Sequence, residues 1–191
     1  DAYNQLEISN SSITNANTKT ITGTKADQVA MAQENGNNTS GVPLSADKIK
    51  LTNDVNGKIN LTGSIKNAIG VYVEDGQAAN ESGKDIEISD LNTSGTGTPS
   101  IGMIAKAAAG KTAKVINAGT IKAYGEAIGM NVEDNSEGEN TGTITAKNLP
   151  SAGVEYKSIG AYINGANAKF TNTGTISTEN IGLALKDTTA N

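Results

Sequence analysis

The sequence predicts an all-β fold, a single-chain parallel β-helix (solenoid) of about six rungs joined by loops of variable length. The first observation behind this prediction is a phrase, Ile-Gly followed by an apolar residue, that occurs five times. The second is another phrase, Asn-x-Gly-Thr-Ile, that occurs three times and alternates with the first. Alternating phrases of fixed composition indicate that one structural unit is repeated along the chain. The glycines of the first phrase are Gly70, Gly102, Gly129, Gly160 and Gly182, and the asparagines of the second are Asn117, Asn140 and Asn172.

Apolar residues around each Ile-Gly pair alternate with period two, which predicts strands rather than helices. In one copy Ile159, Ala161 and Ile163 alternate with Gly160 and Tyr162. We therefore expect the isoleucine of each pair to face the interior, and the glycine and the residue two further on to face solvent. One such strand cannot bury itself, but strands stacked about 4.8 Å apart can pair their backbone groups and enclose a thin core.

The Asn-x-Gly-Thr-Ile phrase predicts a second strand in each rung, with its isoleucine inward and its threonine outward. A third strand is expected just before the asparagine, at 114–117 and 169–172. The third rung lacks this phrase, and we assign Ile86 and Ile88 to its core by alternation alone. The asparagines are expected to stack in a column at a corner, where their amides can bond to one another.

We expect one β-helical segment over 1–191, with clear repeats in 60–185 and irregular or degenerate first rungs in 1–59. Three insertions are expected to leave the rungs as loops, and they contain all three prolines. These insertions cover 33–48, 75–85 together with 92–99, and 145–158. The outward position four residues after each repeat glycine reads Glu74, Lys106, Glu133, Asn164 and Lys186. If the rungs align, opposite charges there lie on neighbouring strands and attract one another.

The composition argues against catalysis. The chain has no Cys, no His and no Arg, so it lacks a conventional nucleophile–base pair and a bidentate carboxylate-binding side chain. We expect no catalytic residue, no cofactor and no metal site. The net charge of −5 argues against nucleic-acid partners, and no stretch approaches the roughly 18 apolar residues of a membrane span, so no direct membrane insertion is expected.

Binding is expected from loops and outward tyrosines. Apolar and aromatic residues on a protruding loop suit contact with a partner, although Tyr156 could instead fold back over a corner of the helix. The candidate ligand-binding residues are Leu149, Val154, Tyr156 and Lys157 on the last insertion, together with Tyr72 and Tyr162.

The two phrases in succession resemble the passenger repeats of large autotransporter adhesins, in particular the fusobacterial type, over residues 60–185. The resemblance implies a right-handed β-helix that is secreted through a C-terminal outer-membrane barrel and displayed outside a Gram-negative cell, with this chain as an internal fragment. It also implies a partner, which would be a host-cell receptor, a surface glycan or another bacterium.

We therefore expect a non-enzymatic adhesin segment of the bacterial cell surface. The segment either binds its partner itself or forms the stalk that presents a binding site elsewhere. Insertions of unequal length favour binding, because a bare spacer would tolerate uniform rungs. Two alternatives remain: a polysaccharide-acting β-helix enzyme that uses acid clusters, and an ice-binding solenoid with a flat Thr-x-Thr face.

Overall fold

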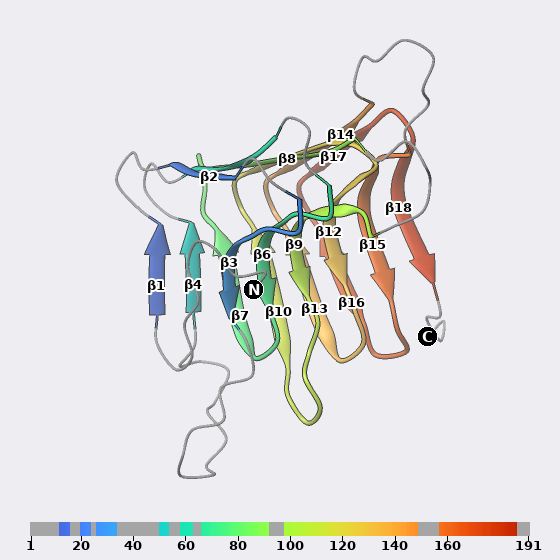
Figure 1. The fold of residues 1–191 in the computed structure, drawn as a ribbon. Coiled ribbons are helices and arrows are strands. Elements are labelled where there is room, and N and C mark those ends of the chain that lie inside the picture. The colour runs from blue at the N-terminus through green and yellow to red at the C-terminus, as the bar shows by residue number, and fades with distance from the viewer. Residues whose placement is uncertain are drawn as a thin grey trace.

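The fold is a parallel β-helix. The computed structural model describes residues 12–15, 20–23, 26–33, 50–53, 58–62, 66–91, 98–148 and 157–186. These ranges contain eighteen β-strands, arranged in three parallel six-stranded sheets (Figure 1). Each rung contributes one strand to each sheet, so the expectation of an all-β solenoid of about six rungs is confirmed. Within the described ranges, no helix is long and apolar enough to cross a membrane.

Each sheet takes every third strand of the chain. Sheet 1 consists of β1 (Ser12–Asn15), β4 (Lys50–Asn53), β7 (Gly76–Asn80), β10 (Ala113–Asn117), β13 (Ser136–Asn140) and β16 (Lys169–Asn172). Sheet 2 consists of β2 (Thr20–Gly23), β5 (Lys58–Leu61), β8 (Asp85–Asp90), β11 (Thr120–Gly125), β14 (Thr143–Lys147) and β17 (Thr175–Thr178). Sheet 3 consists of β3 (Val29–Gln33), β6 (Ile69–Val73), β9 (Ser100–Ala105), β12 (Ala127–Val132), β15 (Ile159–Asn164) and β18 (Ile181–Lys186).

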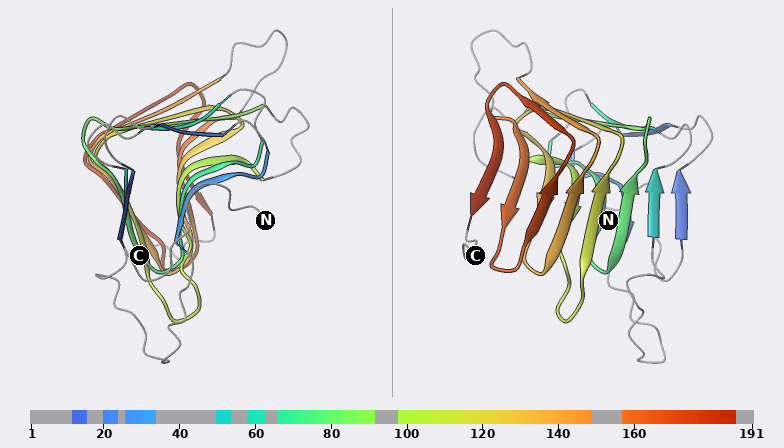
Figure 2. Two further views of the ribbon diagram at one scale, coloured as in Figure 1. Left: turned by 60° about the vertical axis from the view of Figure 1, so that its left-hand side comes forward. Right: turned by 180° about the vertical axis from the view of Figure 1, so that it is seen from behind.

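The three sheets enclose a narrow core. In the left view of Figure 2, which looks from the N-terminal end, the chain rises through sheet 1 on the left, crosses to the right through sheet 2 and descends through sheet 3. The chain therefore turns clockwise as it moves away from the viewer, which makes the coil right-handed. The inward residues of sheet 2 form one column of isoleucines across all six rungs, and the four middle ones are fully buried. The first and the last pack against the same core. This column is Ile21, Ile59, Ile86, Ile121, Ile144 and Ile176.

The repeat glycines bend sheet 3, and here the sequence-based prediction was wrong. A Cβ on Gly102 would lie 2.5 Å from the carbonyl oxygen of Gly129 and 2.7 Å from Cγ2 of the core residue Ile121, so the glycine faces inward. Met103, which follows it, is also fully buried in the core. Two successive inward positions interrupt the alternation, so the preceding Ile101 faces outward. Figure 2 shows this bend as an L shape in the strands of sheet 3.

The asparagine column forms at the corner between sheets 1 and 2, as its spacing predicts. Nδ2 of Asn117 donates to Oδ1 of Asn140 at 2.8 Å, and Nδ2 of Asn140 donates to Oδ1 of Asn172 at 2.7 Å. Asn80, which the sequence analysis missed, donates in the same way to Asn117 at 2.8 Å. The backbone register continues the column through Asn53 to Asn15, so every rung has an asparagine at this position.

All three expected insertions prove to contain strand residues. Residues 76–80, assigned to a loop, form β7, and residues 145–147 belong to β14. At the edges of the expected insertions, Gln33 ends β3 and Asp85 begins β8. The strand β7 reads Gly-Gln-Ala-Ala-Asn and has no large apolar side chain, so its sequence lacks the usual hydrophobic alternation. Residues 81–84, 98–99, 148 and 157–158 of these insertions lie between strands, as expected, and residues 34–48, 92–97 and 149–156 lie outside the described residues.

The predicted charge column is present on the outside of the corner that follows sheet 3. Nζ of Lys106 lies 3.4 Å from Oε2 of Glu133 on the next rung. On the other side, the backbone N–H of Lys106 donates to the carbonyl oxygen of Val73, which places Lys106 beside Glu74. An acid, a base and an acid therefore follow one another across three rungs.

Candidate binding surface

The outward isoleucines of sheet 3 form a small apolar cluster outside the main core. Ile101, Ile104 and Ile128 are only 3%, 4% and 6% exposed although they lie on the outer side of the coil. They are buried because the bend brings the two arms of each strand together on its concave side. Half-buried side chains flank them. We call this cluster the apolar elbow, and it consists of Ile69, Tyr72, Ile101, Ile104, Ile128, Ile159 and Tyr162.

The two tyrosines predicted to bind a ligand both belong to the apolar elbow. Tyr72, Ile104, Asn131 and Tyr162 occupy the same position on successive rungs. Tyr72 and Tyr162 are thus three rung steps apart, about 14 Å at a strand spacing near 4.8 Å. Both rings are partly exposed, so each can offer a face to a partner.

A polar rim borders the apolar elbow on the side of the charge column. The hydroxyl of Tyr72 donates to Oε1 of Glu74 at 2.5 Å. Nδ2 of Asn131 donates to Oε1 of Glu133 at 3.3 Å. The amide oxygen of Asn131 is buried and has no hydrogen-bond partner, which makes it an uncompensated acceptor inside an apolar cluster.

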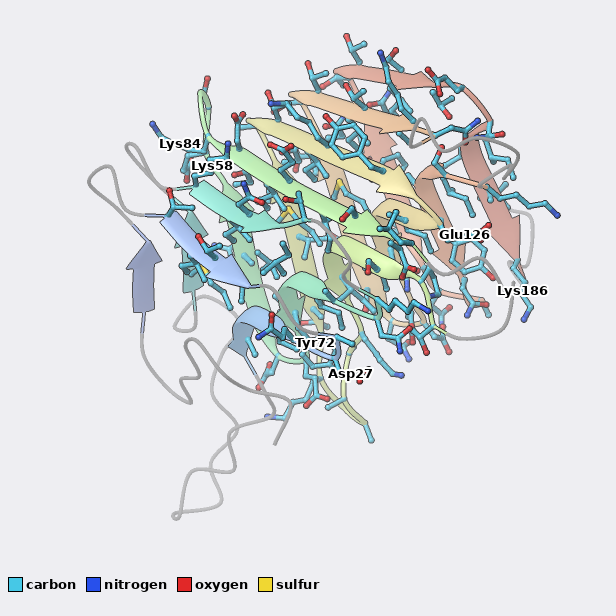
Figure 3. The ribbon with its side chains drawn as sticks, turned by 45° about the horizontal axis from the view of Figure 1, so that its top comes forward. Asp27, Lys58, Tyr72, Lys84, Glu126 and Lys186 are labelled. Carbon is cyan, nitrogen blue, oxygen red and sulfur yellow. The ribbon has the colours of Figure 1, made fainter. Side chains whose placement is uncertain are left out.

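The loop of the last insertion starts and ends at backbone groups that are held by glutamates. The N–H of Asn148 donates to Oε2 of Glu179 at 2.9 Å, and the N–H of Lys157 donates to Oε1 of Glu126 at 3.3 Å. Lys157 is exposed at the entrance to β15. Figure 3 shows Tyr72 towards the N-terminal end of the molecule and Glu126 towards the C-terminal end. Three predicted ligand-binding residues lie outside the described residues: Leu149, Val154 and Tyr156.

The outer face of sheet 2 contains paired charges. Nζ of Lys58 lies 3.5 Å from Oε2 of Glu87, and Nζ of Lys122 lies 3.5 Å from Oδ2 of Asp85. Burial raises the pKa of the neighbouring Tyr124, and the charge of Glu87 raises it further. In the part of the chain that the structure describes, no three His, Cys, Asp or Glu side chains converge as a metal site would require.

The outer face of sheet 2 also contains the threonines on which the ice-binding alternative depends. Thr120, Thr143 and Thr175 align on three successive rungs. The rung before them has Asp85 at this position, and Lys122 follows Thr120 on its own strand. The threonine array is therefore short and is bordered by charges, unlike the flat, uninterrupted face that binding to ice requires.

The chain was compared with known protein families, curated proteins and solved structures. One family model matches residues 2–158, which is most of the chain. The chain belongs to the BigA third pectate lyase-like domain family. BigA is a bacterial surface protein, so this BigA-type domain is a β-helical domain of the surface-protein class. No curated protein and no solved structure matched.

The family match extends to the start of the fifth strand of sheet 3, and the geometry of the last rung continues the same pattern. Strands β16, β17 and β18 lie beyond the matched residues but pair in parallel with β13, β14 and β15. The BigA-type domain therefore keeps one architecture through all six rungs.

The apolar elbow was not predicted. A strict period of two places the isoleucines of the Ile-Gly pairs in the core, and strand alternation leaves no other place for them. A signal was present: glycine recurs after isoleucine in five copies of the repeat, and a glycine repeated inside strands indicates a bend or a close backbone approach. The glutamates that hold the loop ends carry no comparable signal, because each occurs once.

Proposed function

We propose that this BigA-type domain is a non-enzymatic adhesin domain that is displayed on the bacterial cell surface. It attaches to a host-cell receptor, a surface glycan or another bacterium. The observation that carries this proposal is the pair of partly exposed tyrosines, Tyr72 and Tyr162, that the apolar elbow holds on the outside of the coil. Aromatic side chains bordered by polar residues are typical of interaction surfaces.

The position of the last insertion supports a binding surface that includes both this loop and the apolar elbow. Its ends are attached through Glu126 and Glu179 to rungs on both sides, so the loop starts from fixed points next to sheet 3. Fixed loop ends reduce the conformational entropy that is lost on binding. We propose that residues 149–156 and Lys157 contact the partner together with Tyr72 and Tyr162.

A second role as a stalk is supported by the C-terminal end of the coil. Leu183 and Leu185 occupy inward positions of sheet 3 but are 51% and 64% exposed, whereas Ile163 in the rung before is 2% exposed. Gly182 occupies the bend position, yet a Cβ there would meet only Cγ2 of Thr178 at 3.5 Å. The other bend glycines each have the next rung against them. We therefore propose that the coil can also act as a stalk, because this end presents an uncovered apolar rung on which another β-rung can stack.

The decisive experiment measures binding of the purified domain to epithelial cells, to bacterial cells and to a printed glycan array. One variant replaces residues 149–156 by a short Gly-Ser turn and keeps Asn148 and Lys157. A second variant combines Tyr72→Leu with Tyr162→Leu, which removes the rings but keeps apolar side chains in the elbow. A control variant combines Thr120→Ala with Thr175→Ala on the outer face of sheet 2.

We expect saturable binding by the parent domain and by the sheet 2 control, and at least about tenfold weaker binding by the two test variants, as for the loss of one good contact. If the folded parent domain binds no cell and no glycan, the domain is a stalk, and the proposal that residues 149–156, Lys157, Tyr72 and Tyr162 bind a partner is wrong. Release of oligosaccharides from polygalacturonate by the purified domain would instead support the enzyme alternative.

A further inference from the structure

A groove crosses the outer face of sheet 1, on a different side of the coil from the apolar elbow. It has a volume of about 760 Å³ and follows the first residues of β7, β10, β13 and β16. Four rungs extend about 14 Å along the axis of the coil, and the volume lies within the usual range for ligand sites. The lining includes several small residues, among them Gly76, Ala113, Ser136 and Ala168. The groove is therefore shaped for an elongated ligand that runs along the coil.

The loop at 106–112 borders this groove and is fixed to both neighbouring rungs. The N–H of Ala108 donates to the carbonyl oxygen of Glu74 at 3.0 Å, and the carbonyl oxygen of Thr112 accepts from the N–H of Gly76 at 2.9 Å. On the other side, the N–H of Ala107 donates to Oγ of Ser136 at 3.0 Å. The side of the groove that this loop forms is thus preorganised.

Lysines outnumber carboxylates in the lining. Three lysines line the groove, and Glu137 is the one carboxylate among its described lining residues. The amides of Gln77, Asn135 and Asn167 add both N–H donors and carbonyl acceptors, and Nδ2 of Asn167 donates to Oδ1 of Asn135 at 3.1 Å. A groove of this composition favours a ligand that is rich in anionic acceptors. The lysines are Lys111, Lys114 and Lys169.

The carboxylates that balance these lysines leave the groove accessible to an anion. Lys111 pairs at 3.0 Å with Asp75, whose side chain is only 3% exposed and does not line the groove. Lys114 pairs at 3.1 Å with Glu139, further along β13. The pair between Lys169 and Glu137 is the longest of the described ion pairs, at 3.9 Å, and both side chains are largely exposed. Exposed pairs of this kind contribute little stability, so an anion can replace Glu137 beside Lys169 at low cost.

We propose that this groove binds a sulfated linear polysaccharide of the glycosaminoglycan type. Lys114 and Lys169 lie two rungs apart, about 10 Å, on a line parallel to the coil axis, and Glu137 occupies the same position on the rung between them. A chain with repeated sulfates can contact both lysines if the exposed carboxylate of Glu137 turns away from Lys169. Lysine ammonium groups act as non-directional point charges, so they can pair with the sulfates of such a chain without the fixed planar geometry of arginine, which this sequence lacks. This inference is independent of the apolar elbow.

The test is the affinity of the purified domain for heparin, measured by calorimetry and by the salt concentration that elutes the domain from a heparin column. The test variant combines Lys114→Gln with Lys169→Gln. The matched control combines Lys58→Gln with Lys122→Gln, which changes the net charge equally but on sheet 2, where both lysines are also in ion pairs. A third variant, Glu137→Gln, removes the one acid that lines the groove.

We expect the domain to bind heparin in a salt-dependent manner and the test variant to bind at least about fivefold more weakly, with a shallower dependence on salt because two ion contacts are lost. The sheet 2 control should bind like the parent domain, and Glu137→Gln should bind more tightly, an increase that misfolding cannot produce. The proposal is overturned if heparin does not bind, if the control loses as much affinity as the test variant, or if desulfated heparin or polyglutamate binds equally well.

Discussion

Gly102 and Gly129 stack so closely at the bend of sheet 3 that the carbonyl oxygen of Gly129 lies 2.5 Å from the place where a Cβ on Gly102 would be. The same contact recurs between Gly70 and Gly102, and between Gly129 and Gly160. The obstacle is backbone and not a flexible side chain, so it cannot move aside without a shift of the rung. Glycine occupies this position in five of the six rungs, and the register places the buried Ala30 there in the first rung. Between rungs that stack as closely as those of Gly102 and Gly129, the bend leaves no room for a methyl group.

Replacing Gly102 by Ala should destabilise the domain by about 1–3 kcal/mol, the usual cost of forcing an extra methyl group into a packed site. Equilibrium unfolding in urea measures this change. Gly182→Ala is the matched control, because its Cβ would meet nothing closer than 3.5 Å. Its free energy of unfolding should stay within about 0.5 kcal/mol of the parent value. Equal losses at the two positions would show that the contact between rungs does not explain the conserved glycine of the repeat.

The asparagine column predicts that a substitution in its middle reduces the stability of the domain more than a substitution at its exposed end. Asn117 accepts from Asn80 and donates to Asn140, and it is fully buried. Asn117→Ala leaves Asn80 without one acceptor and Asn140 without one donor, and we expect a loss of about 1–3 kcal/mol or more for the buried groups left unpaired. Asn172→Ala at the exposed end should cost less, since water can replace the lost partner. Thermal unfolding of both variants checks this order.

Much of the architecture could be predicted because it is repeated. The isoleucines of sheet 2 and the asparagines at the corner recur with constant neighbours, so their places follow from strand alternation and stacking. The register of charges was predictable for the same reason, and the pair of Lys106 with Glu133 has the expected partners. Repetition therefore determines which positions stack, even where the loops between them differ in length.

The sequence analysis failed where the backbone departs from a regular strand or where a strand lacks large side chains. At Gly102 the bend places two successive residues inward, and no count of alternating residues shows such a change. In β7 the inward Ala78 is 1% exposed, and its small side chain gives no hydrophobic pattern to detect. The groove over sheet 1 was missed because its lysines come from separate rungs, and only the stacking brings them to one surface.

Tyr124 should titrate later than an ordinary tyrosine, because burial and the charge of Glu87 raise its pKa. The folded state holds this proton more tightly than the unfolded state does. Its contribution to stability is therefore fully present below the pKa of an unfolded tyrosine and is lost as the pH rises through the folded pKa. Titration of tyrosinate absorbance for the parent domain and for Tyr124→Phe isolates this group. Lys122→Ala should delay the titration further, because the positive charge of Lys122 lowers the pKa.

Asn131 is expected to be a site where a substitution increases stability. Its Oδ1 is buried without a hydrogen-bond partner, while its position in the register lies between Ile104 and Tyr162 of the apolar elbow. A buried acceptor without a donor costs about 1–3 kcal/mol, so Asn131→Ile should raise the free energy of unfolding by an amount of this order.

The neighbouring rung supplies the precedent for this substitution, since Ile104 occupies the same position with 4% exposure. Asn131→Asp provides the comparison, because it keeps the size of the side chain but places a charge in the apolar cluster beside Glu133, and it should destabilise the domain. Thermal and urea unfolding of the two variants measure both effects. A loss of stability in Asn131→Ile would mean that the hydrogen bond from Nδ2 to Glu133 outweighs the cost of the unpaired oxygen. In that case the polar rim, and not the apolar cluster, would determine which residue this position requires.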